Sequence, residues 1–130
     1  MKGLFDNHNH SQFSFDGKKT TVESSALAAK EKGLGGICFS DHCDFYVPPM
    51  KASFEDLVPE HFDITQQQAE IDRIRALTGD RFKILKGIEI GMYDECRNQI
   101  RKVLSDNTFD QIIASVHYIE QTDPYYGGFY

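Results

Sequence analysis

A buried carboxylate is predicted within the stretch Phe82-Lys83-Ile84-Leu85-Lys86-Gly87-Ile88-Glu89-Ile90-Gly91. Its apolar residues indicate a strand from 82 to 90, which Gly91 ends. A carboxylate inside an apolar strand is costly to bury unless a cation or hydrogen-bond donors compensate its charge. Glu89 therefore predicts either a metal ion or a buried ion pair with Lys or Arg, and the metal ion is the favoured interpretation.

Three more short strands are expected along the chain, at residues 3–8, 36–40 and 111–117. Segments of helical character separate the four strands, at roughly 20–33, 63–79 and 94–104. Apolar strands that alternate with amphipathic helices predict a parallel sheet with helical crossovers. The fold class is therefore α/β, and 130 residues are enough for one core.

Two of the helices carry sequence signals at their ends. Thr20 and Glu23 predict a capping box for the first helix, and Gly33 follows its last turn. Asp63 and Gln66 predict the cap of the second helix, which Gly79 closes. The residues expected to face inward on the three helices are Ala26, Leu27, Ala28, Ile64, Ile71, Ile74, Leu77, Ile100, Val103 and Leu104.

Four of the five histidines fall where a predicted strand ends, namely His8, His10, His42 and His117. The strand from 82 to 90 carries Glu89 near its end instead. In a parallel α/β sheet the carboxyl ends of the strands lie on one side, and ligands bind there. Five potential metal ligands from four separate segments are therefore expected to converge.

Taken one at a time, these residues also have ordinary interpretations. His8 and His10 are two residues apart and project to the same side of an extended segment, but two surface histidines give the same pattern. His117 alone could be a satisfied core histidine. Asp41 is expected to orient a neighbouring ring or to bind metal itself. His61 lies off any strand end and is expected to be a surface residue.

The kinds of ligand restrict the metal. Imidazole and carboxylate groups without thiolate suit Zn²⁺, Fe²⁺ or Mn²⁺ better than Ca²⁺ or Mg²⁺. Such ions lower the pKa of a bound water toward ~7 and screen the charge of a phosphate ester. The predicted reaction class is metal-assisted hydrolysis with a metal-bound hydroxide as nucleophile, and no side chain is assigned as the nucleophile.

Composition excludes several kinds of partner. The net charge is −6 and the Lys and Arg residues are scattered, so no nucleic-acid surface is expected. No apolar stretch approaches the ~20 residues that span a membrane. Cys38, Cys43 and Cys96 form no C-x-x-C pair, which favours a reduced, cytoplasmic setting without disulfides. Cys43 is interpreted as an ordinary free thiol rather than a nucleophile.

Four linked motifs resemble those of the PHP (polymerase and histidinol phosphatase) family, and their order and spacing agree over essentially the whole chain. They are Asp6-Asn7-His8-Asn9-His10-Ser11 with Phe15-Asp16-Gly17, then Phe39-Ser40-Asp41-His42, Gly87-Ile88-Glu89 and Ser115-Val116-His117. Within the family, Ser115-Val116-His117-Tyr118 followed by Asp123-Pro124-Tyr125-Tyr126 is similar to the histidinol-phosphatase branch. Members of that branch hydrolyse L-histidinol phosphate to histidinol and phosphate in histidine biosynthesis.

The resemblance implies a fold and a set of metal ligands. Residues 1–130 would form the N-terminal half of a distorted (β/α)7 TIM-like barrel with parallel strands, and the complete barrel would hold up to three divalent ions (Zn, Fe or Mn). The first ion would be held by His8, His10 and Glu89, and Glu89 would bridge to a second ion at His117.

A third ion would be served by Asp16 and His42, although some members of the family have histidine at the position of Asp16. Asp6 and Asp41 would support the ligands from behind without binding an ion.

The chain departs from the family pattern in its length. A complete member has roughly twice as many residues and further ligands after the point where this sequence stops. The chain is therefore expected to be a fragment that exposes the edges of its first and fourth strands and self-associates through them. Weak metal occupancy and little or no phosphatase activity are expected of the fragment alone.

Two alternatives remain open from the sequence. One is a different PHP phosphoesterase that acts on another small phosphate ester, a choice expected to depend on the loop at 43–62. The other is a non-catalytic metal-binding module that keeps the fold without turnover.

Overall fold

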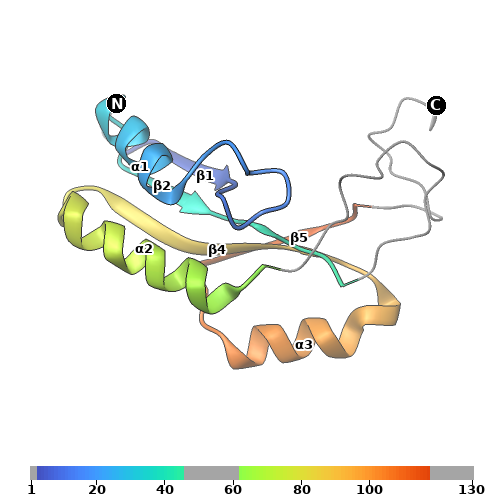
Figure 1. Ribbon diagram of the computed structural model, residues 1–130. Helices are drawn as coiled ribbons and strands as arrows, with labels where there is room; N and C mark the ends of the chain where they lie inside the picture. The colour runs from blue at the N-terminus through green and yellow to red at the C-terminus, as the bar shows by residue number, and fades with distance from the viewer. Residues whose placement is uncertain (1–2, 46–61, 118–130) are drawn as a thin grey trace, which may run out of the picture.

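Within residues 3–45 and 62–117, the part of the chain that the computed structural model describes, five strands pair in parallel (Figure 1). The strands are β1 (Phe5–Asn9), β2 (Gly36–Phe39), β3 (His42–Cys43), β4 (Lys83–Gly91) and β5 (Gln111–Ser115). The helices are α1 (Val22–Glu31), α2 (Ile64–Thr78), the 3-10 turn η1 (Asp94–Cys96) and α3 (Arg97–Asp106). The predicted alternation of strands and helices is therefore confirmed.

The short strand β3 continues β2 after a two-residue break at Ser40 and Asp41. Gly36 of β2 pairs with Lys83 of β4, and His42 of β3 pairs with Glu89, so both strands keep a register offset of 47 residues (83 − 36 and 89 − 42). Because β5 also pairs with β4 from Gly87 to Gly91, it must occupy the opposite edge of β4. The strands thus follow the order β1, β2 with β3, β4 and β5.

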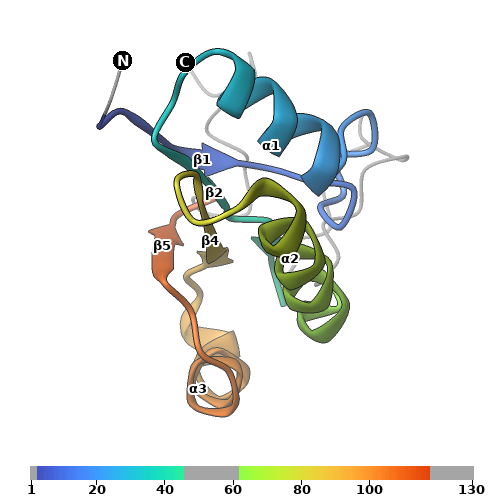
Figure 2. The same cartoon turned by 90° about the vertical axis from the view of Figure 1, so that its left-hand side faces the viewer.

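The helices lie around one side of this sheet, as Figure 2 shows. Helix α1 connects β1 to β2, α2 precedes β4, and η1 with α3 connects β4 to β5. This parallel α/β half-barrel is the architecture predicted from the sequence.

Two apolar clusters fill the space between helices and sheet. The first joins α1 and α2 to β2 and the start of β4, and includes Val22, Ala26, Ile37, Phe39, Ile71, Ile74 and Ile84. The second joins η1 and α3 to β3 and the end of β4, and includes Cys43, Ile88, Ile90, Cys96 and Ile100.

Helix α1 begins one residue later than the sequence predicted. Thr21, not Thr20, is the N-cap, and it exchanges hydrogen bonds with Ser24 rather than Glu23. The hydroxyl of Thr20 is already committed to the preceding loop, where it donates to the carbonyl oxygens of His10 and Gly17 at 3.1 Å. The Thr20–Glu23 capping box was therefore wrong by one position.

The predicted ends of α2 are confirmed. Asp63 accepts a hydrogen bond from the Gln66 backbone at 3.0 Å and another from the Gln66 side chain at 3.0 Å. Gly79 ends the helix with a φ of 75°, a conformation that glycine adopts without the steric cost of a Cβ atom.

Three predicted core positions, Leu27, Ala28 and Leu77, face solvent instead. Leu27 is 50% exposed and Leu77 is 64% exposed. On α2 the buried positions are Gln67, Ile71, Ile74 and Thr78, so two polar residues take places in the buried stripe and Leu77 falls outside it. In the described part of the chain no helix is long and apolar enough to cross a membrane.

This burial pattern predicts opposite outcomes for two similar truncations on α2. Ile74→Ala removes a side chain that is 1% exposed and should cost about 2–5 kcal/mol of unfolding free energy. Leu77→Ala should stay within about 0.5 kcal/mol, because its side chain is mostly in water. Urea denaturation of the two variants measures both values, and an equal loss at Leu77 would contradict the burial described here.

Candidate metal centre

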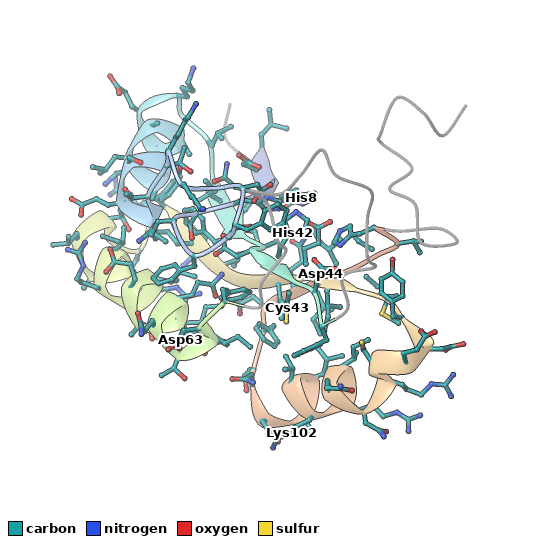
Figure 3. The ribbon with its side chains drawn as sticks, turned by 45° about the vertical axis from the view of Figure 1, so that its right-hand side comes forward. His8, His42, Cys43, Asp44, Asp63 and Lys102 are labelled. Carbon is teal, nitrogen blue, oxygen red and sulfur yellow. The ribbon has the colours of Figure 1, made fainter. Side chains whose placement is uncertain are left out.

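The six metal ligands predicted from the sequence come together where the parallel strands end, and Figure 3 labels two of them, His8 and His42. His8 lies in β1 and His10 follows it, His42 begins β3, Glu89 lies near the end of β4, and His117 follows β5. β1 places His8 and His10, and β3, β4 and β5 place one residue each; pairing of the strands brings their carboxyl ends to the same edge.

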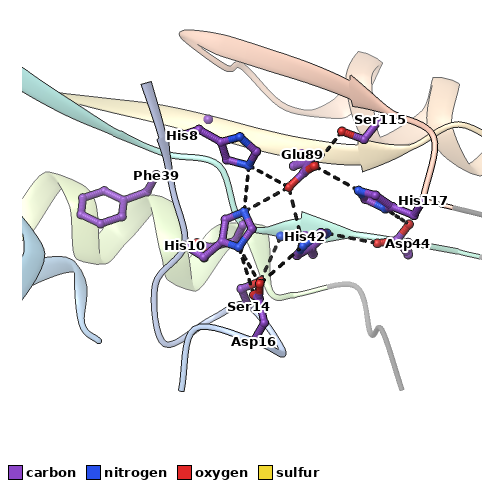
Figure 4. A network of polar contacts seen from close by, with 12 residues as sticks. His8, His10, Ser14, Asp16, Phe39, His42, Asp44, Glu89, Ser115 and His117 are labelled. Carbon is purple, nitrogen blue, oxygen red and sulfur yellow. Dashed lines mark hydrogen bonds and ion pairs between the residues drawn. The ribbon is translucent and has the colours of Figure 1, made fainter. Parts of the chain in front are cut away.

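Three ligand atoms form a nearly equilateral triangle at the entrance to this cluster (Figure 4). The His8 Nε2 and His10 Nε2 atoms are 3.1 Å apart, and each lies 3.0 Å from Oε2 of Glu89. Two donors that bind one ion at ~2.0–2.2 Å lie about 3 Å apart when the angle between them is near 90°. The triangle therefore has the dimensions of three ligands of a single metal ion.

The second oxygen of Glu89 faces a different histidine. Oε1 is 3.0 Å from Nε2 of His117 and accepts a hydrogen bond from the Ser115 hydroxyl at 2.6 Å. On the other side, His42 Nε2 stands 3.6 Å from Oε2. Oε2 thus faces three imidazoles and Oε1 faces a fourth, as a bridging ligand requires.

Asp16 is brought to the cluster by a series of tight turns after β1. Its carboxylate lies 2.8 Å from His10 Nδ1 and 3.6 Å from His42 Nε2, and the Ser14 hydroxyl donates to it at 2.6 Å. Gly17 closes the turn, because a Cβ atom there would come within 1.9 Å of the Ser11 carbonyl oxygen. The motif therefore needs both residues, because Asp16 supplies the charge and Gly17 permits the turn.

Asp44 is a member of the cluster that the sequence reasoning missed. Its carboxylate lies 2.7 Å from His117 Nδ1 and 3.5 Å from His42 Nδ1, and its side chain is 1% exposed. The available signal was its spacing: Asp44 stands two residues after His42, and alternate residues of an extended segment share a face. Figure 3 shows Cys43, between them, on the helix side of the sheet.

The two acids predicted to support the ligands have different partners. Asp6 accepts from the His8 backbone N–H at 3.3 Å, directly beneath the first histidine. Asp41, fully buried, accepts from the Ser11 backbone and hydroxyl at 2.5 and 2.8 Å and from Gln67 at 2.7 Å. Its contacts therefore hold the loop that follows His10 rather than an imidazole ring.

Gln67 was also missed by the sequence reasoning. Its Nε2 atom donates to Asp41, and the same atom lies 3.4 Å from the Phe39 carbonyl oxygen and 3.5 Å from the Gly87 carbonyl oxygen. The sequence held a signal, since Gln67 occupies the apolar face between Ile64 and Ile71 of α2. A polar residue at a buried helical position needs a hydrogen-bond partner, and here the partner belongs to the site.

Burial and ion pairing oppose one another at these groups. Burial disfavours the charged rings of His10 and His117, but hydrogen bonds to Asp16, Asp44 and Glu89 outweigh it and raise the pKa of both rings to about 9. Burial also disfavours the charged carboxylates, yet their imidazole partners hold the pKa of Asp16, Asp44 and Glu89 below the usual range. The three carboxylates therefore stay ionised, which is the form of the side chain that binds cations.

The remaining sequence predictions have separate outcomes. Cys43 is fully buried, and burial raises the pKa of its thiol to about 12, so it is protonated at neutral pH as an unreactive thiol would be. His61, most of the loop at 43–62 and the Asp123–Tyr126 motif lie outside the described residues.

Fold and cluster together define an α/β protein with a candidate metal centre at the carboxyl ends of its strands. The PHP domain model matches residues 6–129. This chain belongs to the PHP family.

Its relatives are consistently named for one activity. A histidinol-phosphatase of Lactococcus lactis is 37% identical over 127 residues, which are 98% of this chain and 44% of the relative. A probable histidinol-phosphatase of Clostridium acetobutylicum is 32% identical over 94% of this chain and 42% of the relative. The chain thus spans less than half the length of the curated relatives that it matches.

Solved structures agree with the fold. The crystal structure of histidinol phosphate phosphatase from Lactococcus lactis, complexed with zinc, L-histidinol and phosphate, superposes with a TM-score of 0.81 at 31% identity, over 98% of this chain and 45% of that one. A putative histidinol phosphatase from Listeria monocytogenes shares the fold with a TM-score of 0.73 at 18% identity, over 89% of this chain and 46% of that one.

Proposed function

We propose that this chain forms the metal-binding part of a histidinol-phosphatase, which hydrolyses L-histidinol phosphate to L-histidinol and phosphate. The observation that carries the proposal is the arrangement of histidines on the two oxygens of Glu89, with His8 and His10 at Oε2 and His117 at Oε1. The Lactococcus lactis structure, solved with zinc, L-histidinol and phosphate, supports both the metal and the substrate.

The donor set fits divalent zinc, iron or manganese. Four imidazoles and three carboxylates lie within the three groups of possible ligands among the described residues: His8, His10 and Glu89; His10, Asp16 and His42; and His42, Asp44 and His117. These nitrogen and oxygen ligands suit such ions better than an all-oxygen site would.

The residues present divide among up to three ions. His8, His10 and Glu89 would hold the first, and Glu89 would be shared with a second at His117. Asp16 and His42 would hold a third, with Asp6 and Asp41 behind the ligands. When bound, these ions supply Lewis acidity toward a phosphoryl oxygen and lower the pKa of water toward ~7.

The chain's own part in the reaction is to place charge. Glu89 is 5% exposed, and its imidazole partners keep its pKa below the usual range, so the anionic carboxylate would hold cations beneath the open side of the cluster. His8, whose side chain is 51% exposed, marks that open side, from which a phosphate ester can approach. Net attraction for a small phosphorylated substrate then depends on the bound cations, because the carboxylates alone would repel it.

Removal of the Glu89 charge should weaken metal binding. In Glu89→Gln the bridging carboxylate becomes a neutral amide, and zinc affinity should fall by at least ~10–100-fold, the loss typical of weaker perturbations around metal ligands. Isothermal titration with zinc on the 130-residue chain measures the change.

Glu31→Gln is the matched control, because Glu31 is exposed at the end of α1 and the substitution changes the same charge. Its affinity should equal that of the unaltered chain. If Glu89→Gln bound zinc as tightly as the unaltered chain does, the proposed metal centre would be contradicted.

Activity is expected only in a longer context. The chain spans 44% of its Lactococcus lactis relative, and the family pattern supplies further ligands beyond that part. The isolated chain with zinc should release phosphate from L-histidinol phosphate far below the ~1–10³ s⁻¹ typical of enzymes. A chimera, in which this chain replaces the matched segment of the Lactococcus lactis enzyme, should hydrolyse it, and Glu89→Gln should abolish that activity.

The chimera also separates the competing functions. If it folds and binds zinc but hydrolyses only other phosphate esters, the chain belongs to a different PHP phosphoesterase. If it binds zinc and hydrolyses none, the chain is a non-catalytic metal-binding module. Circular dichroism and zinc content identify a chimera that has not folded.

Self-association and a cytoplasmic setting form part of the same proposal. Among the described residues β1 pairs only with β2, and β5 pairs only with β4, so each has an edge free for another strand. Ile112 and Val116 on β5 are 50% and 57% exposed, which is apolar surface that a second copy could cover. The cytoplasmic setting is proposed from the sequence pattern of the three cysteines, which includes no C-x-x-C pair.

The isolated chain should therefore form dimers or larger assemblies. Size-exclusion chromatography with light scattering gives the mass, and Ile112→Lys should shift it toward the monomer by placing a charge on the exposed strand. A stable monomer at micromolar concentration would contradict self-association and leave the metal centre unaffected.

A further inference from the structure

Asp44 lies behind the cluster, on the side away from the triangle of His8, His10 and Glu89 (Figure 4). Its carboxylate is the partner of two rings at once, with Oδ1 at 2.7 Å from His117 Nδ1 and Oδ2 at 3.5 Å from His42 Nδ1. Both rings direct their other nitrogen toward Glu89: His117 Nε2 is 3.0 Å from Oε1, and His42 Nε2 is 3.6 Å from Oε2.

The contact between Asp44 and His117 has the geometry of a hydrogen bond. The 2.7 Å between Asp44 Oδ1 and His117 Nδ1 is a normal length for a charge-assisted N–H···O bond. The other nitrogen of the ring, Nε2, faces Glu89 at 3.0 Å. Asp44 therefore accepts a hydrogen bond from His117 Nδ1, and the metal side of this ring is Nε2.

The contact with His42 carries a second, independent observation. His42 Nδ1 and Asp44 Oδ2 are both buried without a hydrogen-bond partner, and they face each other at 3.5 Å. A buried polar atom without a partner is costly, and a small approach of these two atoms satisfies both. That approach places the proton of His42 on Nδ1 and frees Nε2, which lies near Asp16 and Glu89.

Gly91 makes room for this carboxylate. A Cβ atom at Gly91 would lie 1.9 Å from Oδ1 of Asp44 and 3.4 Å from His117 Nδ1. Gly91 does not have a positive φ, so its backbone alone does not demand glycine. The lack of a side chain at the end of β4 is needed because the Asp44–His117 pair occupies that space.

We propose that Asp44 is a positioning residue whose two oxygens accept from Nδ1 of His42 and of His117, so that both rings present an unprotonated Nε2 to the metals. This inference rests on the proposed metal centre and adds to it a single buried carboxylate that couples the ligands of two ions. Carboxylates that hold ligating histidines in this way fix the tautomer and the orientation of the ring.

The test uses Asp44→Asn in the 130-residue chain. Asparagine keeps the shape but offers one acceptor and one donor, so one ring must take its proton on Nε2, where it can no longer bind an ion. Zinc affinity should fall ~10–100-fold. Long-range nitrogen–proton NMR of labelled histidine should show the Nδ1–H form of both rings in the zinc-loaded chain, and of only one ring in Asp44→Asn.

Gly91→Ala reaches the same carboxylate without altering any ligand. Its new methyl group displaces Asp44, so zinc affinity should fall to a similar extent, and the double variant should be no weaker than either single one. Ile74→Ala is the control for instability alone: it loses unfolding free energy in the first apolar cluster but should keep both tautomers and the zinc affinity.

The outcomes separate this inference from the proposed function. If the unaltered chain binds no zinc, the metal centre itself is wrong. If it binds zinc and Asp44→Asn binds equally well with both tautomers unchanged, the metal centre stands and the role of Asp44 is overturned. Loss of affinity in Ile74→Ala as large as in Asp44→Asn would also overturn it, because instability would then explain the effect.

Discussion

The structure depends on the charge of Glu89, a carboxylate only 5% exposed near the end of the central strand. A carboxylate at such a position must be compensated, or its burial would cost several kcal/mol. Its two oxygens are met by His8, His10 and His117 at 3.0 Å and by the Ser115 hydroxyl at 2.6 Å. Because β4 pairs with strands on both edges, these partners are drawn from the strands around it.

The groups behind the ligands decide how firmly the cluster is held. Asp41 ties Ser11, directly after His10, to Gln67 of α2, and so connects the loop after β1 with the helical layer. Asp44 occupies the matching place behind His42 and His117. Two glycines, Gly17 and Gly91, leave the space into which the Ser11 carbonyl and the Asp44 carboxylate fit. The sequence motifs thus specify glycines that leave room for the site, in addition to the side chains proposed to bind metal.

A half-barrel is sufficient to bring these groups together. The matched part of the Lactococcus lactis enzyme covers 45% of that chain, yet it superposes with a TM-score of 0.81. Four consecutive strand positions already place their carboxyl ends around one point, since neighbouring strands lie only ~4.8 Å apart. The geometry of the cluster therefore arises from local parallel pairing.

The sequence by itself determined the α/β class, the order of its elements and the residues that meet at the strand ends. Hydrophobic periodicity and strand-end position are local properties, and they were enough to single out His8, His10, His42, Glu89 and His117. The sequence could not place Leu77 in water, Gln67 in the core or Asp44 behind two histidines, and it placed the α1 cap one residue early. These features depend on which partner each side chain meets across the sheet, and only the tertiary structure decides that, because distant segments come within hydrogen-bond range only after the strands have paired.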